Sequence, residues 1–434
     1  MPKRILRHES AAARRPGTRS PVAVWSVAVA VIAAVTATGL ALSVSSAPAS
    51  PPAAVHANSS ATAVGSPQAH VRLSGGVPVD YRRTQAGAEA AAQNFVIVSG
   101  SSAFLTDTSA RHAAMATLAA GSSVATMTEV ADSEAGAAMA TLKGAAQIDA
   151  SEVIARTGVL SVHTLGFDIH RAMFRLWTVA IQGNDSGDIA PSSTFQSVTV
   201  SLVWQANDWK VESSSVANGL VAPTEYQQGT SNSGDFSGFT AEQAQDAFVS
   251  GALGAAGYPS PYARSQDGAQ EAATSAAMLW GDPRFFANDS WRHQMLAAVA
   301  APSALSTIRA DADSTAQQVQ QAQGINSEGT TPDGGVLVTG TAVLATRVVA
   351  YSDESASFQL WTASIGGIAG ADDGERPQVA YLLMTVDLSW SGGTWKVSAV
   401  SPGDPLVPSP PDTEASSGQD FSEIGGAADA PTTA

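Results

Sequence analysis

The chain has 434 residues, of which 44% are hydrophobic, so it is long enough for two or three globular domains. It contains no cysteine, which excludes disulfides, thiolate metal sites and cysteine nucleophiles. The net charge is −16, and the first 20 residues are basic, so the rest of the chain is more acidic still. An acidic surface repels phosphate backbones, and we expect no direct nucleic acid binding by that part.

The N-terminal segment predicts a membrane anchor. Residues 1–20 form a basic tail, and residues 21–44 carry no charge. At 1.5 Å per residue, the uncharged stretch can cross a hydrocarbon core of about 30 Å. The positive-inside rule then places the N-terminus in the cytoplasm and the C-terminal domains outside the cell membrane. Ala47-Pro48-Ala49 resembles a signal-peptide cleavage site, but the apolar stretch is longer than the usual ~7–15 residues. We therefore expect a retained signal-anchor, in a single-pass protein.

Three further segments are assigned outside the globular domains: a tether, a C-terminal tail and a connecting segment. Residues 45–75 are rich in Ala, Pro and Ser and predict an extended tether. Residues 410–434 are expected to be a disordered tail. Residues 226–258 are assigned as a connecting segment, within which Ala241–Leu253 has helical spacing.

The region between tether and tail contains an internal repeat. YRRTQAGAEAAAQNFVIVSG begins at Tyr81, and YARSQDGAQEAATSAAMLWG begins at Tyr262, a spacing of 181. Further along, at a spacing of 184 to 186, FRLWTVAIQG matches FQLWTASIGG and VSLVWQANDWKV matches VDLSWSGGTWKV. Co-linear matches of this kind indicate one domain duplicated in tandem, at residues 76–225 and 259–409.

Each copy begins with helical patterns. Thr84 and Ser265 are expected to cap a first helix, in which alanines and larger apolar residues recur at helical spacing. A second helix is predicted to start near Ser109 or Ser290. A third, less regular stretch has helical content around 144–156 and 314–323.

The second part of each copy alternates with a period of two, which is typical of strands. Phe174, Leu176, Thr178 and Ala180 alternate with residues of the opposite face, and Val198, Val200, Leu202 and Trp204 share one face of a later strand. Gly392-Gly393 and Asn207-Asp208 predict tight hairpin turns. Helices followed by about four antiparallel strands predict an α+β domain with helices packed on a curved sheet.

Motifs that carry chemistry are scarce, and we predict no enzyme. A phosphate-binding loop, a paired-histidine helix motif and a Gly-x-Ser-x-Gly elbow do not occur. His163 and His170 are near enough in sequence to meet on a strand pair, but no third metal ligand has a recognisable spacing. We therefore assign no catalytic, cofactor-binding or metal residue, and no cofactor.

Three features shared by the copies have both a functional and a structural interpretation. His112 and His293 each follow an arginine, and they are either polar pocket groups at a helix–sheet junction or, as we favour, helix residues that cap or pack locally. The paired tryptophans are expected to pack across a hairpin more readily than to stack on a ligand; they are Trp204 with Trp209 and Trp390 with Trp395. Trp177 and Trp361 are expected in the core. The acidic loop residues favour solvated loops over calcium sites; they are Asp185, Asp188, Asp372, Asp373 and Glu375.

The overall plan resembles a known family. A basic tail, one anchor, a tether and tandem helix-plus-sheet domains are similar to the scaffold proteins of Gram-positive conjugation machines, whose exported part is two domains of the nuclear transport factor 2 type. VPVDYRRTQAGAEAAAQNF, from Val77 to Phe95, and the WKV hairpins look like membrane-anchored proteins of actinobacterial integrative and conjugative elements. The resemblance covers about residues 76–409, and a fold alone implies no function.

The resemblance implies a non-catalytic, membrane-anchored scaffold subunit of a conjugative DNA-transfer apparatus of the type IV secretion kind. Its expected partners are other membrane proteins of that apparatus, with a homo-oligomer left open. The alternative is an extracytoplasmic binding module that holds a lipid or another apolar ligand in a cone-shaped pocket between helices and sheet.

Overall fold

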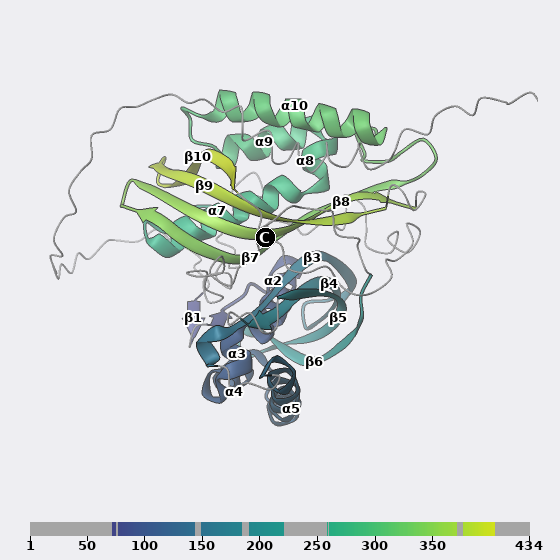
Figure 1. Ribbon diagram of the computed structural model, residues 1–434, viewed down its shortest axis with the longest axis vertical. Coiled ribbons are helices and arrows are strands. Elements are labelled where there is room, and N and C mark those ends of the chain that lie inside the picture. The colour runs from purple at the N-terminus through teal and green to yellow at the C-terminus, as the bar shows by residue number, and fades with distance from the viewer. Residues whose placement is uncertain are drawn as a thin grey trace, which may run out of the picture.

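Two copies of one α+β arrangement make up the computed structural model of this chain (Figure 1). The structure describes residues 72–74, 77–143, 149–184, 191–220, 258, 260–370 and 376–403. The expected basic tail, the anchor at 21–44, most of the tether and the C-terminal tail lie outside these residues, as do Ala241–Leu253 and the five acidic loop residues named above. Among the described helices, none combines the length and the apolar character needed to span a membrane.

The first copy places its helices before its sheet. Its helices are α2 (Gln85–Ser99), α3 (Ser102–Thr106), α4 (Thr108–Leu118) and α5 (Val124–Lys143), followed by a 3-10 turn, η1 (Ala150–Glu152). Its antiparallel sheet has the order β3-β4-β5-β6, from β3 (Val153–Phe167), β4 (Arg171–Asn184), β5 (Ser192–Gln205) and β6 (Asp208–Asn218). A small hairpin of β1 (Arg72–Ser74) and β2 (Val77–Val79) precedes α2, so the last residues of the expected tether form a strand.

The second copy repeats this order. Its helices are α7 (Gln266–Gly281), α8 (Pro283–Ala287), α9 (Asp289–Val299) and α10 (Leu305–Gln323). Its sheet has the order β7-β8-β9-β10, from β7 (Val336–Tyr351), β8 (Ser355–Ala369), β9 (Gln378–Ser391) and β10 (Thr394–Gly403). Both sheets are four-stranded meanders, which confirms the predicted α+β class with about four antiparallel strands in each copy.

The first helix of each copy starts where its cap residue predicts. The Thr84 hydroxyl accepts a hydrogen bond from the Gly87 N–H at 3.1 Å, and the Ser265 hydroxyl accepts one from Gly268 at the same distance. These bonds satisfy backbone donors that a helix leaves without an internal partner. The predicted second helices correspond to α4 and α9, which start at Thr108 and Asp289, close to the predicted starts; the short helices α3 and α8 before them were not predicted.

The predicted third helix corresponds to α5 and α10; it lies earlier in the chain than predicted in the first copy and is longer than predicted in the second. In the first copy α5 ends at Lys143, and the described residues from Ala150 onward form η1 and then β3, so a helix continuing to Arg156 is wrong. In the second copy the predicted helical residues 314–323 are confirmed as part of α10, which starts earlier, at Leu305. The physical reason is a narrow contact face: only Ala131, Ala135 and Leu142 of α5 are buried. Such a helix has little apolar periodicity to detect.

The predicted hairpin turn at Gly392-Gly393 is confirmed, and that of the first copy lies at Ala206-Asn207, one residue before the predicted Asn207-Asp208. Ala206 and Asn207 have φ angles of 52° and 62°, and Gly392 and Gly393 have φ angles of 63° and 80°. Two consecutive positive φ angles are typical of the type I′ turns that match strand twist. Across these turns Trp204 pairs with Trp209, and Trp390 pairs with Trp395.

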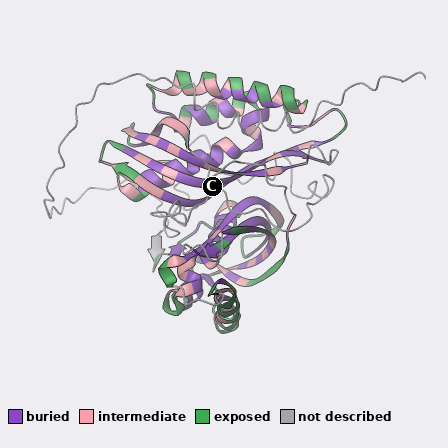
Figure 2. Ribbon diagram, viewed as in Figure 1, coloured by how far each residue is buried: buried purple, intermediate pink, exposed green. Residues whose placement is uncertain are grey.

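Each copy has its own core between sheet and helices. In the first copy every residue of α2 from Gly87 to Val98 is buried, because the sheet covers one side of the helix and other elements cover the rest. Inward-facing strand residues Phe174, Leu176, Val198 and Val200 complete this core. Figure 2 shows the same alternation of buried and less buried residues along both sheets.

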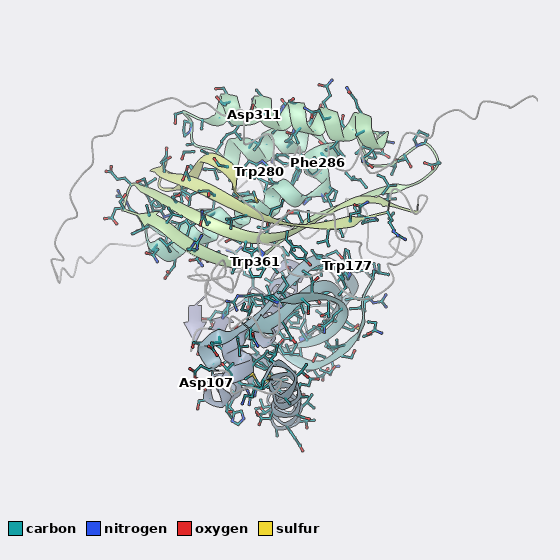
Figure 3. All side chains as sticks on the ribbon, in the orientation of Figure 1. Asp107, Trp177, Trp280, Phe286, Asp311 and Trp361 are labelled. Carbon is teal, nitrogen blue, oxygen red and sulfur yellow. The ribbon has the colours of Figure 1, made fainter. Side chains whose placement is uncertain are left out.

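A further core joins the two copies. The opposite faces of the two sheets contribute to one buried cluster, which includes Trp177 and Phe195 of the first copy and Trp361 and Tyr381 of the second. Figure 3 places Trp177 and Trp361 where the sheets face one another. Both tryptophans are buried as predicted, but they lie in the interface between the copies and away from each copy's own core.

Small residues allow the edge strands of the two sheets to approach closely. A Cβ added to Gly158 of β3 would lie 2.7 Å from the Ala342 Cβ of β7, and one added to Gly340 would lie 2.5 Å from the Leu160 carbonyl oxygen. Ala342 follows Gly158 at the repeat spacing of 184. Equivalent positions of the two copies therefore meet, as in a symmetric dimer interface.

The boundary of the second copy needs one correction. Tyr258, assigned to the connecting segment, is buried in the core of the second copy together with Tyr262. Burial raises the pKa of both phenols well above their usual range. The second domain therefore includes Tyr258.

Candidate functional site

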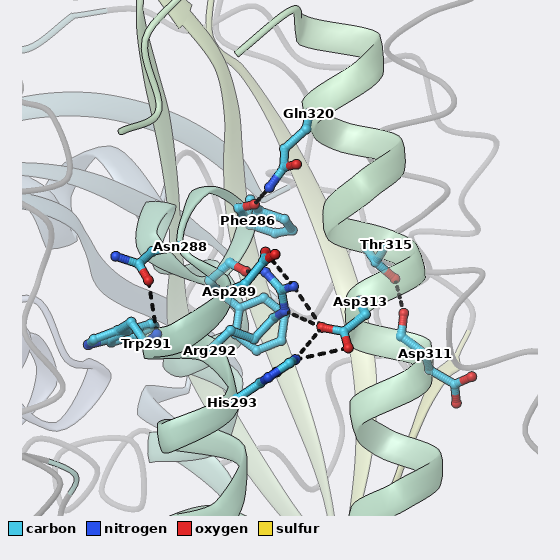
Figure 4. Close-up of polar contacts among 11 residues, drawn as sticks. Phe286, Asn288, Asp289, Trp291, Arg292, His293, Asp311, Asp313, Thr315 and Gln320 are labelled. Carbon is cyan, nitrogen blue, oxygen red and sulfur yellow. Dashed lines mark hydrogen bonds and ion pairs between the residues drawn. The ribbon is translucent and has the colours of Figure 1, made fainter. Parts of the chain in front are cut away.

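The polar feature shared by both copies is an Arg-His-Asp cluster, which in the second copy lies between α9 and α10 (Figure 4). Arg292 donates from Nε and Nη2 to Asp313 Oδ1 at 2.9 and 2.7 Å, and from Nη1 to the Phe285 carbonyl at 2.9 Å. The His293 Nε2 lies 2.8 and 2.9 Å from the two oxygens of the same carboxylate. One aspartate of α10 thus holds two neighbouring side chains of α9.

The first copy has the same arrangement between α4 and α5. Arg111 Nε donates to Asp132 Oδ1 at 2.7 Å, and Arg111 Nη1 donates to the Phe104 carbonyl at 2.8 Å. The His112 Nε2 lies 2.9 Å from Asp132 Oδ2. In both copies the arginine is buried and the carboxylate is partly exposed.

The electrostatics of the clusters keep both carboxylates ionised. Hydrogen bonds from His112 and Arg111 hold the pKa of Asp132 below its usual value. Burial acts to raise the pKa of Asp313, but the bonds and charges of Arg292 and His293 outweigh it, so the net shift is downward. A carboxylate held this way is a poor proton acceptor, and the geometry suits an ion-paired clamp between helices.

These clusters decide between the two interpretations of His112 and His293. The histidines lie between helices and contact an aspartate of the next helix, so the assignment to a helix–sheet pocket is wrong. The favoured interpretation as structural helix residues fits these contacts, but the partner lies on the next helix, 20 residues away, and is not local. The aspartates were missed by sequence reasoning, although Asp132 and Asp313 are themselves related by the repeat spacing of 181.

The tryptophan pairs also serve packing, as predicted. The rings of Trp204 and Trp209 meet edge to face with centroids 5.4 Å apart, and Trp390 and Trp395 do so at the same distance. The indole N–H of Trp209 donates to the Arg82 carbonyl at 2.9 Å, and that of Trp395 donates to Ala263. Each pair therefore fastens the segment before the first helix to the last hairpin.

Arginines cover the outer tryptophan of each pair. The guanidinium of Arg83 lies 5.3 Å from the Trp204 ring centroid, and that of Arg264 lies 5.3 Å from Trp390. Such cation–π contacts contribute about 0.5–1 kcal/mol at exposed sites. They occupy the ring face that a stacking ligand would need.

The two histidines considered for a metal do not pair. His163 lies opposite Arg175 in the β3–β4 ladder, and His170 lies in the turn, where its Nδ1 is 2.6 Å from Arg83 Nη2. Among the described residues, no group of three or more His, Asp or Glu side chains is placed to hold a metal ion. Asp185 and Asp188, like Asp372, Asp373 and Glu375, lie outside those residues.

A buried carboxyl group distinguishes the first copy from the second. Glu89 of α2 is 7% exposed, and burial raises its pKa to about 7. Its carboxylate oxygen accepts a long hydrogen bond of 3.4 Å from Gln93. The second copy has the neutral Gln270 at the same repeat position. Sequence reasoning missed Glu89. An acidic residue surrounded by alanines in the first helix was the pattern that could have indicated a buried carboxyl group.

Exposed apolar side chains recur at the same place on the first hairpin of each sheet. Leu165 of β3 and Val349 of β7 are 40% and 56% exposed, and each occupies a β-bulge near the hairpin tip. Ile169 and Met173 are also exposed on the first copy's hairpin. Bulges redirect a side chain out of the regular alternation, which leaves these residues on the surface.

The fold places the chain among mixed helix and antiparallel-sheet proteins, with two four-stranded sheets. No family model and no curated protein matches the sequence. One similar solved structure is described as an "Ntf2 like protein involved in plasmid conjugation". The match covers 58% of this chain and 79% of that chain, with 7% sequence identity and a TM-score of 0.18.

Proposed function

We propose that this protein is a non-catalytic, membrane-anchored scaffold subunit of a conjugative DNA-transfer apparatus and acts through protein–protein contacts. The observation that carries the proposal is what the two copies share. Their common residues form caps, hairpins, helix clamps and cores, while exposed apolar residues recur on the first hairpin of each sheet. Shared packing with shared exposed apolar residues suits a structural protein that docks with others.

The packing of the cores supports a scaffold over a ligand carrier. In each copy the first helix lies along the inward face of the sheet, and its side chains join those of the strands in one cluster. Phe95, Phe174 and Trp209 occupy this space in the first copy. A lipid carrier instead requires an enclosed apolar cavity.

The test uses the full-length protein in the cells from which it comes. We expect detergent extraction and affinity capture to recover other membrane proteins of a DNA-transfer apparatus, and deletion to abolish transfer. A double variant, Leu165→Ser with Val349→Ser, is expected to weaken capture and keep the fold. The matched control is Ser109→Ala with Ser314→Ala, which alters small surface residues away from the hairpins.

Two results would contradict the proposal. Recovery of this protein by itself, with unchanged DNA transfer in the deletion strain, would remove the scaffold role. Native mass spectrometry that finds a lipid released stoichiometrically from the purified protein would favour the ligand-binding alternative.

A further inference from the structure

The outer edge of the first sheet is open along one half of β6. Every residue from Ser213 to Asn218 is exposed, and Val216 is 58% exposed although it lies opposite the buried Val198 of β5. β6 is the last strand of its sheet, so among the described strands none pairs with its outer side (Figure 1). An open strand edge presents backbone donors and acceptors that a further strand can satisfy.

The hydrogen-bond pattern identifies which residues face outward. The Gly219 N–H donates to the Phe195 carbonyl of β5 at 3.1 Å, and the two residues continue the β5–β6 register. Hydrogen-bonded pairs alternate along an antiparallel ladder, so Ser213, Ser215 and Ala217 also bond to β5. The N–H and C=O groups of Ser214, Val216 and Asn218 therefore point away from the sheet.

The second copy blocks the same edge. Pro402 of β10 lies opposite Met384 and follows Val216 at the repeat spacing of 186, so it occupies an outward-pointing position. Proline has no N–H to donate, and in sheets it is confined to edges, where it discourages pairing. The duplication thus keeps a closed edge in one copy and an open edge in the other.

We propose that β6 pairs with β6 of a second copy of this chain, antiparallel and centred on Val216. In that register Val216 faces Val216 of the second copy, and Ser214 faces Asn218, with each pair exchanging two backbone hydrogen bonds. The two exposed valines cover each other across the joined sheet. A two-fold axis through Val216 generates this contact from one surface patch, as closed dimers require.

Charge favours a second copy as the occupant. The chain carries a net charge of −16, yet the strand from Ser213 to Asn218 has no charged side chain. The nearest charge, Glu212, pairs with Arg171 of β4 at 3.2 Å and lies opposite the uncharged Leu220 in the proposed register. Two identical edges therefore meet without repulsion along their contact.

Disulfide cross-linking tests the proposed pairing. Because the chain contains no cysteine, one introduced cysteine is the only thiol that can form a disulfide between two chains. In a hydrogen-bonded antiparallel pair the Cα atoms are about 5.5 Å apart, within the ~4.4–6.8 Å that a disulfide spans. Under mild oxidation, full-length Val216→Cys is expected to form a covalent dimer, and the matched variant Pro402→Cys is expected to form no covalent cross-link. Equal cross-linking of both variants, or of neither, would overturn the proposal.

A second measurement follows mass in detergent by light scattering or native mass spectrometry. The wild-type protein is expected to be a dimer of its 44.0 kDa chain. Val216→Pro, which copies the residue of the second copy, removes an outward N–H and no β5 hydrogen bond, and it is expected to weaken dimerisation at least tenfold. Val216→Thr keeps the N–H and is expected to remain dimeric. A monomeric wild type, or a dimer indifferent to Val216→Pro, refutes the inference.

This inference does not depend on the role in DNA transfer. A Val216→Pro protein that is monomeric but still captures transfer proteins separates self-association from scaffolding. A dimeric wild type that captures no transfer protein would leave the strand pairing intact and remove the proposed function.

Discussion

The two copies differ at the joint between the first helix and the last hairpin, and the difference shows how one fold tolerates different chemistry. In the first copy the Tyr81 N–H donates to Asp208 Oδ1 at 2.9 Å, and Lys210 pairs with the same carboxylate at 2.8 Å. In the second copy the Tyr262 N–H donates to the hydroxyl of Thr394 at 2.9 Å. The equivalent lysine, Lys396, donates to the Ala298 carbonyl, and burial lowers its pKa. The hydrogen bond to the tyrosine N–H is retained, while the ion pair is specific to one copy.

The largest expected effect tests whether the two copies act as one body. Trp361 and its counterpart Trp177 both lie in the cluster between the sheets. Trp361→Ala is expected to lower the free energy of unfolding by about 4 kcal/mol, because it removes a large buried side chain and leaves a cavity. Urea unfolding measures the change. When Trp177→Ala is added to Trp361→Ala, the further loss of free energy of unfolding is expected to be smaller than the loss caused by Trp177→Ala alone, because residues of one cluster couple. Losses that add fully would show that the two copies unfold independently.

The next effect tests the equivalence of the helix clamps. Arg292→Ala is expected to lower the free energy of unfolding by about 3 kcal/mol, because the Phe285 carbonyl and Asp313 lose a buried, charged donor. Arg111→Ala is expected to have an effect of the same sign and similar size. Chemical denaturation of each variant measures this, with Ser109→Ala as the control. A loss of stability in only one of the two arginine variants would contradict the expected equivalence of the two clusters.

The buried acid predicts a pH-dependent difference between the copies. Because the folded pKa of Glu89 is about 7 and the unfolded value is near 4.5, the folded state binds the extra proton between these values. The contribution of Glu89 to stability is therefore greatest below about pH 4.5 and falls as pH rises to about 7, by roughly 3 kcal/mol.

Glu89→Gln copies Gln270 of the second copy and tests this point. The variant is expected to exceed the wild type in stability at pH 8 by about 3 kcal/mol and to match it near pH 4.5. Thermal unfolding across this pH range provides the measurement, and the exposed-residue variant Ser109→Ala serves as a control that retains the acid and its surroundings. Identical pH profiles for variant and wild type would contradict the buried assignment.

The smallest effect concerns the contact between the edge strands. Gly158→Ala copies the residue of the second copy, but its Cβ would lie 2.7 Å from that of Ala342. We expect a loss of about 1–2 kcal/mol, because the strands must move apart. Combining it with Ala342→Gly exchanges the two residues and is expected to restore much of the loss. Equilibrium unfolding of the three variants would show no such rescue if the strands did not meet here.

Local patterns made much of each domain predictable. Thr84 and Ser265 predict the starts of their helices because a capping hydrogen bond joins residues only three positions apart. The turns at Asn207 and Gly392 follow from the positive φ angles that two-residue hairpins need. The predicted third helix of the first copy was misplaced because α5 buries too few residues for a clear period.

The sequence indicated only part of the candidate site, the Arg-His pairs, and not their aspartate partners. The Arg-His pairs stood out because they are adjacent in the sequence, but their partners lie 20 and 21 residues away on another helix. No local period links Arg292 to Asp313; only the packing of α9 on α10 brings them together. The repeat spacing was the one signal in the sequence that relates Asp132 to Asp313.

The sequence by itself determined the duplication, the succession of helices followed by strands in each copy, and the approximate place of the tight turns, because these depend on neighbours and on self-similarity. Only the tertiary structure decided which apolar strand face meets helices and which meets the other copy. Phe174 and Trp177 lie on opposite faces of β4, and both faces are buried, so alternation cannot assign their partners. The open edge at Val216 and the closed edge at Pro402 likewise became distinct once the ladder showed which N–H groups point outward.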